Sequence, residues 1–143
     1  LSIVVFYCLT ISFISSVFLN FFTNNLTYNL TKHFYTLEAL ALAIESCKDG
    51  ADIYEVCQKV DAFIEEELGK TFSSKKSKKL ERGIAFPCCI SVNEICGHFS
   101  PLKDDSLKLK LEDLVKVEIG AHIDGFPASC AHSFVIGGKT KGK

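Results

Sequence analysis

The segment from Thr36 to Gly69 carries apolar residues at the spacing of two consecutive helices. The first apolar set comprises Leu37, Leu40, Ile44 and Cys47. Gly50 follows this set and suits the left-handed position after a helix end. The second apolar set comprises Ile53, Val56, Cys57, Val60, Ile64 and Leu68. Because Asp52 stands three residues before Glu55, a spacing that favours a helix start, the pattern predicts a second helix that ends near Gly69.

Beyond Gly83 the pattern changes to that of strands. Residues 84–92 are rich in β-favouring types and are interrupted at Pro87, which indicates an edge strand or a bulge. Leucines alternate with charged residues over 107–112, which indicates a half-exposed strand or an amphipathic segment. The run 114–136 has Asp124 and Gly125 near its centre, and this pair between two β-rich runs is typical of a tight hairpin. Helices followed by an antiparallel hairpin predict an α+β domain.

Residues 1–31 are uncharged and differ in composition from the rest of the chain. Residues 1–22 are long enough to cross a bilayer, since about 20 apolar residues suffice, but they lack the positive flank of a signal peptide. Three interpretations remain open: a membrane anchor, a buried segment, or sequence that does not belong to the native protein. The chain contains no Met and begins at Leu1, so we expect a fragment. A domain over 36–136 would then end in a flexible basic segment over 137–143.

Composition narrows the classes of protein. With 48% hydrophobic and 23% charged residues the chain is not a disordered segment, and its net charge of −1 excludes a dominant basic or acidic arm. The seven cysteines lack a C-x-x-C motif and regular spacing, which argues against a zinc ribbon or a redox motif. We expect them to be mostly buried, reduced thiols.

A basic run lies between the predicted helices and strands. It comprises Lys75, Lys76, Lys78, Lys79 and Arg82. Such a run could hold a phosphate backbone by counterion release, or it could simply be solvated. These five residues are the candidates for RNA binding.

The predicted hairpin brings two polar residues onto one sheet face. With a two-residue turn, Glu118 faces Ala131 and Ser129 faces Gly120, so Glu118 and Ser129 point to the same side and lie within about 7 Å of each other. Two acidic residues there could bridge a pair of divalent metals. Because a neutral hydroxyl is a poor ligand for such ions, the hairpin has the layout of a two-metal site without its chemistry.

Several motifs in order resemble the proliferation-associated (ErbB-receptor-binding) proteins, an inactive branch related to type 2 methionine aminopeptidase. The helical segment 57–67 is similar as well. The motifs are Gly83-Ile84-Ala85-Phe86-Pro87, Ile90-Ser91-Val92-Asn93, His98-Phe99-Ser100-Pro101-Leu102, Asp113-Leu114-Val115-Lys116-Val117 and Gly120-Ala121-His122-Ile123-Asp124-Gly125-Phe126. The resemblance implies the N-terminal half of a pita-bread (creatinase/methionine aminopeptidase-like) fold over 36–136, with the remaining metal ligands of active members in the other half.

The resemblance also implies a function. Active members place an Asp at each position matched by Glu118 and Ser129, so we expect a non-catalytic protein with no metal and no cofactor. Family members associate with RNA, ribosomes and protein partners in the cytoplasm and the nucleus or nucleolus, where they act in transcriptional co-regulation and growth control. The alternative is an active metal-dependent methionine aminopeptidase that removes initiator Met, and a membrane-anchored protein remains a third hypothesis.

Three histidines complete the candidate residues. His98 matches the substrate-side histidine of the active enzymes, although a structural role is an equal alternative, and His132 resembles the inactive branch. His122 lies on the same predicted face as Glu118, which leaves a residual metal contact as a hypothesis. We therefore expect His98 and His122 to line a substrate-side pocket.

Overall fold

A computed structural model describes residues 26–27, 29–71 and 80–138. The chain divides into two units, Leu1–Thr31 and Lys32–Lys143, and the elements below belong to the second. The predictions for residues 1–22 and for Lys75, Lys76, Lys78 and Lys79 fall outside the described residues. Among the helices in the described part of the chain, none combines the length and hydropathy that a bilayer crossing requires.

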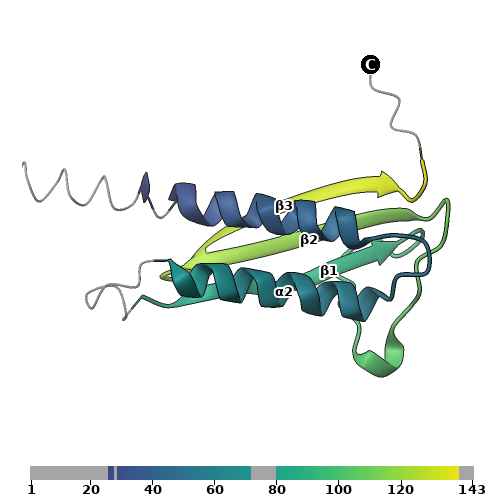
Figure 1. Cartoon of the computed structure of the whole chain (residues 1–143), viewed down its shortest axis with the longest axis horizontal. Coiled ribbons are helices and arrows are strands. Elements are labelled where there is room, and N and C mark those ends of the chain that lie inside the picture. The colour runs from purple at the N-terminus through teal and green to yellow at the C-terminus, as the bar shows by residue number, and fades with distance from the viewer. Residues whose placement is uncertain (1–25, 28, 72–79, 139–143) are drawn as a thin grey trace, which may run out of the picture. The chain divides into compact units, whose positions relative to one another are not determined.

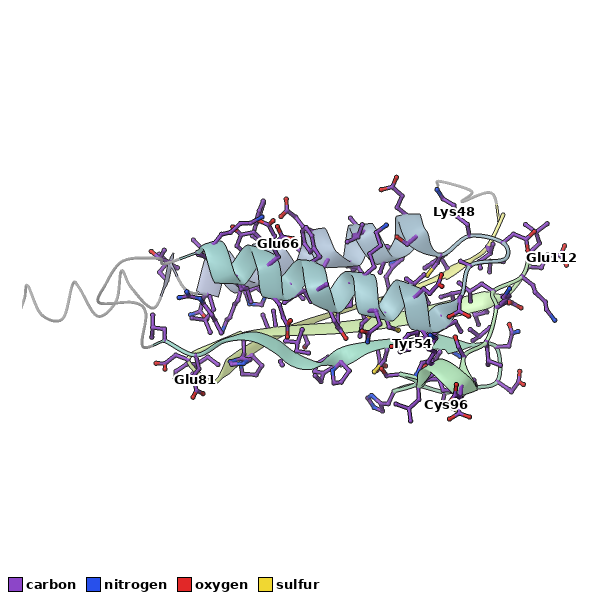
Figure 2. All side chains as sticks on the ribbon, turned by 60° about the horizontal axis from the view of Figure 1, so that its bottom comes forward. Lys48, Tyr54, Glu66, Glu81, Cys96 and Glu112 are labelled. Atoms are coloured by element: carbon purple, nitrogen blue, oxygen red, sulfur yellow. The ribbon has the colours of Figure 1, made fainter. Side chains whose placement is uncertain are left out.

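The second unit is built in two layers, a three-stranded sheet and two helices on one of its faces (Figure 1). Strands β1 (Arg82–Val92), β2 (Leu114–Ile123) and β3 (Phe126–Val135) pair antiparallel in the order β1-β2-β3. The helices are an N-terminal helix and α2 (Ile53–Lys70), and a short 3-10 turn, η2 (Lys103–Asp105), lies between β1 and β2. The turned view of Figure 2 shows both helices on the same side of the strands. This arrangement confirms the predicted α+β class.

Helix α2 has the face that its sequence predicts. Asp52 is its N-cap, and the Asp52 carboxylate accepts a hydrogen bond from the Glu55 backbone N–H at 3.3 Å. The helix ends after Lys70, one residue beyond Gly69. Its buried side chains are Ile53, Val56, Cys57, Val60, Ile64 and Leu68, the predicted set. This apolar face packs against β1 and forms the centre of the core.

The N-terminal helix differs from its prediction in both its start and its buried face. Residues 32–46 of this unit are helical, so the helix begins before Thr36. Leu37, which we placed on the apolar face, is 59% exposed. The most deeply buried positions of the helix are Thr36, Ala39 and Ala43. Small side chains let the helix backbone approach its neighbours closely. The buried face of this helix is therefore lined by small residues, and the spacing of large apolar residues does not identify it.

The hairpin confirms its predicted turn and register. Asp124 and Gly125 both have positive φ, 54° and 77°, as a type I′ turn requires. Ile123 pairs with Phe126, and the register continues without interruption to the pair of Leu114 and Val135. The hairpin therefore fixes which residues of β2 and β3 share a face.

Strand β1 is an irregular edge strand, as Pro87 predicts. Its pairing with β2 shifts register on both sides of Phe86. Of the two alternatives for 107–112, the half-exposed strand is not formed, because this segment makes only an isolated bridge between Lys108 and Asp52. Leu109 alone of its leucines is buried, and its backbone N–H and C=O bond to the chain around Ala51. The segment is held by the loop before α2 rather than by a neighbouring strand.

Candidate functional site

Successive residues of β2 lie alternately on a face of the sheet that the helices cover and on an open face. The helix-covered positions are all buried: Val115, Val117, Ile119, Ala121 and Ile123. The intervening positions carry polar or small residues on the other face: Lys116, Glu118, Gly120 and His122. No described helix covers this second face (Figure 2). The polar side chains of the candidate site therefore gather on the open face of the sheet.

Glu118 and Ser129 occupy the diagonal positions that the hairpin predicts. Glu118 pairs with Ala131 and Ser129 pairs with Gly120, so the two side chains share the open face on adjacent strands. The donor set at these positions consists of one carboxylate and one neutral hydroxyl. Such a donor set fits a pair of divalent cations poorly.

Gly120 is the next open-face residue of β2 after Glu118. An aromatic ring covers it, which leaves no room for a side chain. A Cβ atom built on Gly120 would collide with Cε1 of Phe86, the residue that pairs with Gly120 across β1 and β2. Any side chain at position 120 would force this ring to move. The Phe86 ring therefore occupies the open face between Glu118 and His122.

The loop after β1 brings His98 to Glu118. His98 Nδ1 lies 2.9 Å from Glu118 Oε2, and the His98 side chain is 89% exposed while that of Glu118 is 29% exposed. The loop is held against the outer edge of β1 by two hydrogen bonds around Phe99. The Ile90 N–H donates to the Phe99 carbonyl at 2.8 Å, and the Phe99 N–H donates to the Ser91 hydroxyl at 3.2 Å. His98 itself has a φ of 58°, an uncommon conformation for a residue with a side chain.

Cys89 is the third member of this cluster, and the sequence did not single it out. It pairs with Glu118 across β1 and β2, directly after the irregularity at Pro87. One ligand atom from each of Cys89, His98 and Glu118 lies within 4.8 Å of the other two. Burial, and to a smaller extent the charge of Glu118, raises the pKa of the Cys89 thiol. Pro87 was the available signal, since a bulge at an edge often redirects a side chain near a site.

His122 does not join the cluster. It lies four residues beyond Glu118, about 13 Å along β2 at roughly 3.3 Å per residue, with the Phe86 ring between them. Its Nδ1 atom is buried without a hydrogen-bond partner. The residual contact that we considered between His122 and a metal at Glu118 is therefore not supported by the geometry. His98 and His122 occupy separate places rather than one pocket.

Of the candidate RNA-binding residues, only Arg82 is described. Arg82 is the first residue of β1, and its guanidinium donates to the Gly69 carbonyl at 3.3 Å. This contact links the end of α2 to the start of the sheet. Arg82, the last residue of the basic run, therefore makes a contact within the fold.

Other cysteines behave largely as expected. In the described part of the chain all are free thiols, with Cys47, Cys57, Cys88 and Cys89 buried. Cys96, in the same loop as His98, is exposed, and Cys130 is half-buried. Four of the six described cysteines are buried, which agrees with the expectation that most of them are buried, and Cys96 is the exposed exception.

Comparison with known proteins identifies the family. The family model described as Metallopeptidase family M24 matches residues 33–143. The chain belongs to this family.

Individual relatives define the branch more closely. Proliferation-associated protein A of Dictyostelium discoideum is 50% identical over 99 residues, which cover 69% of this chain and 25% of the relative. ERBB-3 binding protein 1 of Arabidopsis thaliana is 46% identical over the same shares of the two chains. A methionine aminopeptidase of Thermococcus kodakarensis is 36% identical over 66% of this chain and 28% of the enzyme. These matches confirm the resemblance to the proliferation-associated branch.

A solved structure supports the fold. The structure of a thermophilic Arx1 is similar with a TM-score of 0.70 and 28% identity, over 78% of this chain and 30% of that one. The two helices and the antiparallel strands thus correspond to the N-terminal half of the pita-bread fold. The chain spans about a quarter of the length of the first two relatives.

Proposed function

We propose that the chain is part of a non-catalytic binding protein built on a methionine aminopeptidase-like scaffold. The observation that carries this proposal is the pair of residues on the open face. Glu118 and Ser129 share that face on adjacent strands, but only one of them carries a charge. Two-metal hydrolysis depends on anionic ligands that bridge both ions, and a serine hydroxyl does not supply one. The names of the relatives, proliferation-associated protein and ERBB-3 binding protein, support a role in binding.

A peptidase assay tests the non-catalytic part of the proposal. The protein of which the chain is proposed to be part is incubated with Co²⁺ or Mn²⁺ and a peptide that begins with Met, and free Met is measured. We expect release at the rate of the metal-only control. An active metal-dependent aminopeptidase is the alternative function, favoured by the 36% identity to an archaeal methionine aminopeptidase. Turnover that depends on Glu118 and is lost in Glu118→Gln would establish that alternative.

RNA, free or in ribonucleoprotein, is the partner that we propose for the basic run, in the cytoplasm and the nucleus or nucleolus. Five positive charges fall within residues 75–82. Each cation that neutralises a phosphate releases counterions, which makes the affinity depend on salt. The run therefore supplies the electrostatic part of an RNA contact, while the printed name ERBB-3 binding protein 1 suggests protein partners as well.

Replacement of the run measures this contribution. We expect the quadruple change of Lys75, Lys76, Lys78 and Lys79 to Gln to reduce the slope of log affinity against log salt by up to about 3 for single-stranded RNA, at roughly 0.7 per phosphate contact. The matched control replaces four exposed lysines elsewhere, which gives the same net charge: Lys48, Lys59, Lys103 and Lys110. An equal fall in slope for both variants would mean that net charge, and not the run, attracts RNA.

A further inference from the structure

We propose that Cys89, His98 and Glu118 bind one Zn²⁺ ion, in place of the two metals of the active peptidases. The three side chains supply a thiolate, an imidazole nitrogen and a carboxylate oxygen. Their ligand atoms lie within 4.8 Å of one another, and no other such group of three occurs among the described residues. Zinc accepts all three donor types and leaves its fourth position to water in sites with three protein ligands.

The geometry suits a single small cation. Zinc bonds of about 2.0–2.3 Å place tetrahedral ligand atoms roughly 3.5 Å apart. His98 Nδ1 and Glu118 Oε2 are 2.9 Å apart, so they would separate by only about half an ångström to admit the ion. The exposed imidazole can make this adjustment without disturbing the core, because its side chain is 89% exposed.

The backbone places the three ligands from three different segments. Cys89 comes from β1 after the irregularity at Pro87, and Glu118 comes from the opposite position on β2. His98 comes from the loop that Phe99 fastens to the outer edge of β1. Gly97 keeps this loop close, since a Cβ there would lie 3.2 Å from Glu118 Oε1. The ion would thus tie the loop to both strands.

The donor set selects the metal. A thiolate favours zinc, copper(I) and similar soft or borderline ions over Mg²⁺ and Ca²⁺, which prefer oxygen ligands. Ser129 lies on the neighbouring strand and offers only a hydroxyl, so a second ion has no anionic partner there. The proposal does not depend on RNA binding, and the Met-release assay tests separately whether such an ion supports hydrolysis.

Cobalt spectroscopy on the full chain tests the site. After metal is removed under reducing conditions, Co²⁺ is added and then displaced by Zn²⁺. We expect one Co²⁺ per chain, with the near-ultraviolet charge-transfer absorption of a cobalt–thiolate bond and the visible bands of tetrahedral cobalt. Cys89→Ser should abolish the charge-transfer absorption. His98→Ala and Glu118→Gln should each weaken binding by more than about tenfold, since the loss of outer-shell partners alone costs 10–100-fold.

Cys96→Ser is the matched control. Cys96 is an exposed thiol in the same loop, near η2 in Figure 2, and it is not a ligand in the proposed site. We expect this variant to retain both the absorption and the affinity. An absorption that persists in Cys89→Ser, or that disappears in Cys96→Ser, would overturn the proposal. So would the absence of cobalt–thiolate absorption in the unaltered chain.

Amide hydrogen exchange tests metal binding independently of the cobalt absorption. We expect Zn²⁺ to slow exchange over residues 95–99 in the unaltered chain but not in His98→Ala, a variant whose exposed position leaves folding intact. Metal binding with release of Met from a peptide would refute the proposed non-catalytic function while leaving the site in place. Unchanged exchange in the presence of Zn²⁺ would refute the site alone.

Discussion

The two faces of β2 carry different kinds of residues, although these residues alternate along one strand. On the helix-covered face Val117 and Ile119 are fully buried, and their role is to fill the core. On the open face Glu118 contacts a loop histidine and Gly120 lies beneath an aromatic ring. The comparison separates residues that maintain the fold from residues that carry chemistry. Substitutions on each face should therefore have different consequences.

The largest effect is expected from shortening a helix-covered side chain. Ile119→Ala should lower the free energy of unfolding by about 2–5 kcal/mol, because it removes buried methyl groups and leaves a cavity. Leu114→Ala is the matched change on the open face of the same strand, where Leu114 is 41% exposed, and it should cost less than about 1 kcal/mol. Urea unfolding of both variants measures the difference. Equal losses would remove the distinction between the faces.

Gly120→Ala tests the one tightly packed place on the open face. The new Cβ would collide with the Phe86 ring, so we expect a loss of about 1–3 kcal/mol from overpacking. Phe86→Leu should relieve the collision, and the double variant should lose less than the sum of the two single changes. Strict additivity in urea unfolding would show that the ring does not restrict position 120.

A smaller effect concerns the carboxylate that lies between the layers. The Asp61 Oδ1 atom accepts a hydrogen bond from the Cys88 backbone N–H at 2.9 Å. Burial raises the pKa of Asp61, while this hydrogen bond opposes the shift and Glu65 adds to it. Because the folded pKa lies above the unfolded value, the charged form weakens the fold at neutral pH. This destabilisation by the charged carboxylate disappears as Asp61 is protonated, when the pH falls through the folded pKa towards the unfolded value of about 3.9.

Asp61→Asn separates this charge from the hydrogen bond. The amide oxygen can still accept from Cys88, so we expect the variant to match or exceed the unaltered chain in stability at pH 7. As the pH falls towards 4, the unaltered chain should gain relative to the variant. Urea midpoints of both proteins across this range measure the effect. Parallel pH profiles would show that Asp61 does not titrate differently in the folded state.

The sequence predicted best where local rules decide the structure. The α2 face follows from a 3.6-residue period of large side chains, and the hairpin register follows from a two-residue turn at Asp124 and Gly125. The N-terminal helix was harder, because it buries Ala39 and Ala43 while Leu37 is exposed. There the close approach of neighbouring elements, which no local period encodes, determined the face.

The candidate site was predictable only in part, for the same reason. Glu118 and Ser129 are linked by the hairpin, so their shared face could be derived from the turn. Cys89 lies on β1, which the long connection over residues 93–113 separates from β2. Its position opposite Glu118 depends on tertiary pairing that sequence spacing does not determine. The same holds for His98, whose loop is fixed by hydrogen bonds to β1.

The irregularity of β1 also determines which edge of this sheet an additional strand could join. Pro87 has no N–H to offer, and the Ile90 N–H on the outer side is already used by the Phe99 carbonyl. Among the described residues, no strand pairs with β3 on the side away from β2. An extended peptide that adds by backbone hydrogen bonds would thus find its template beside β3, while the bulged margin is protected against aggregation.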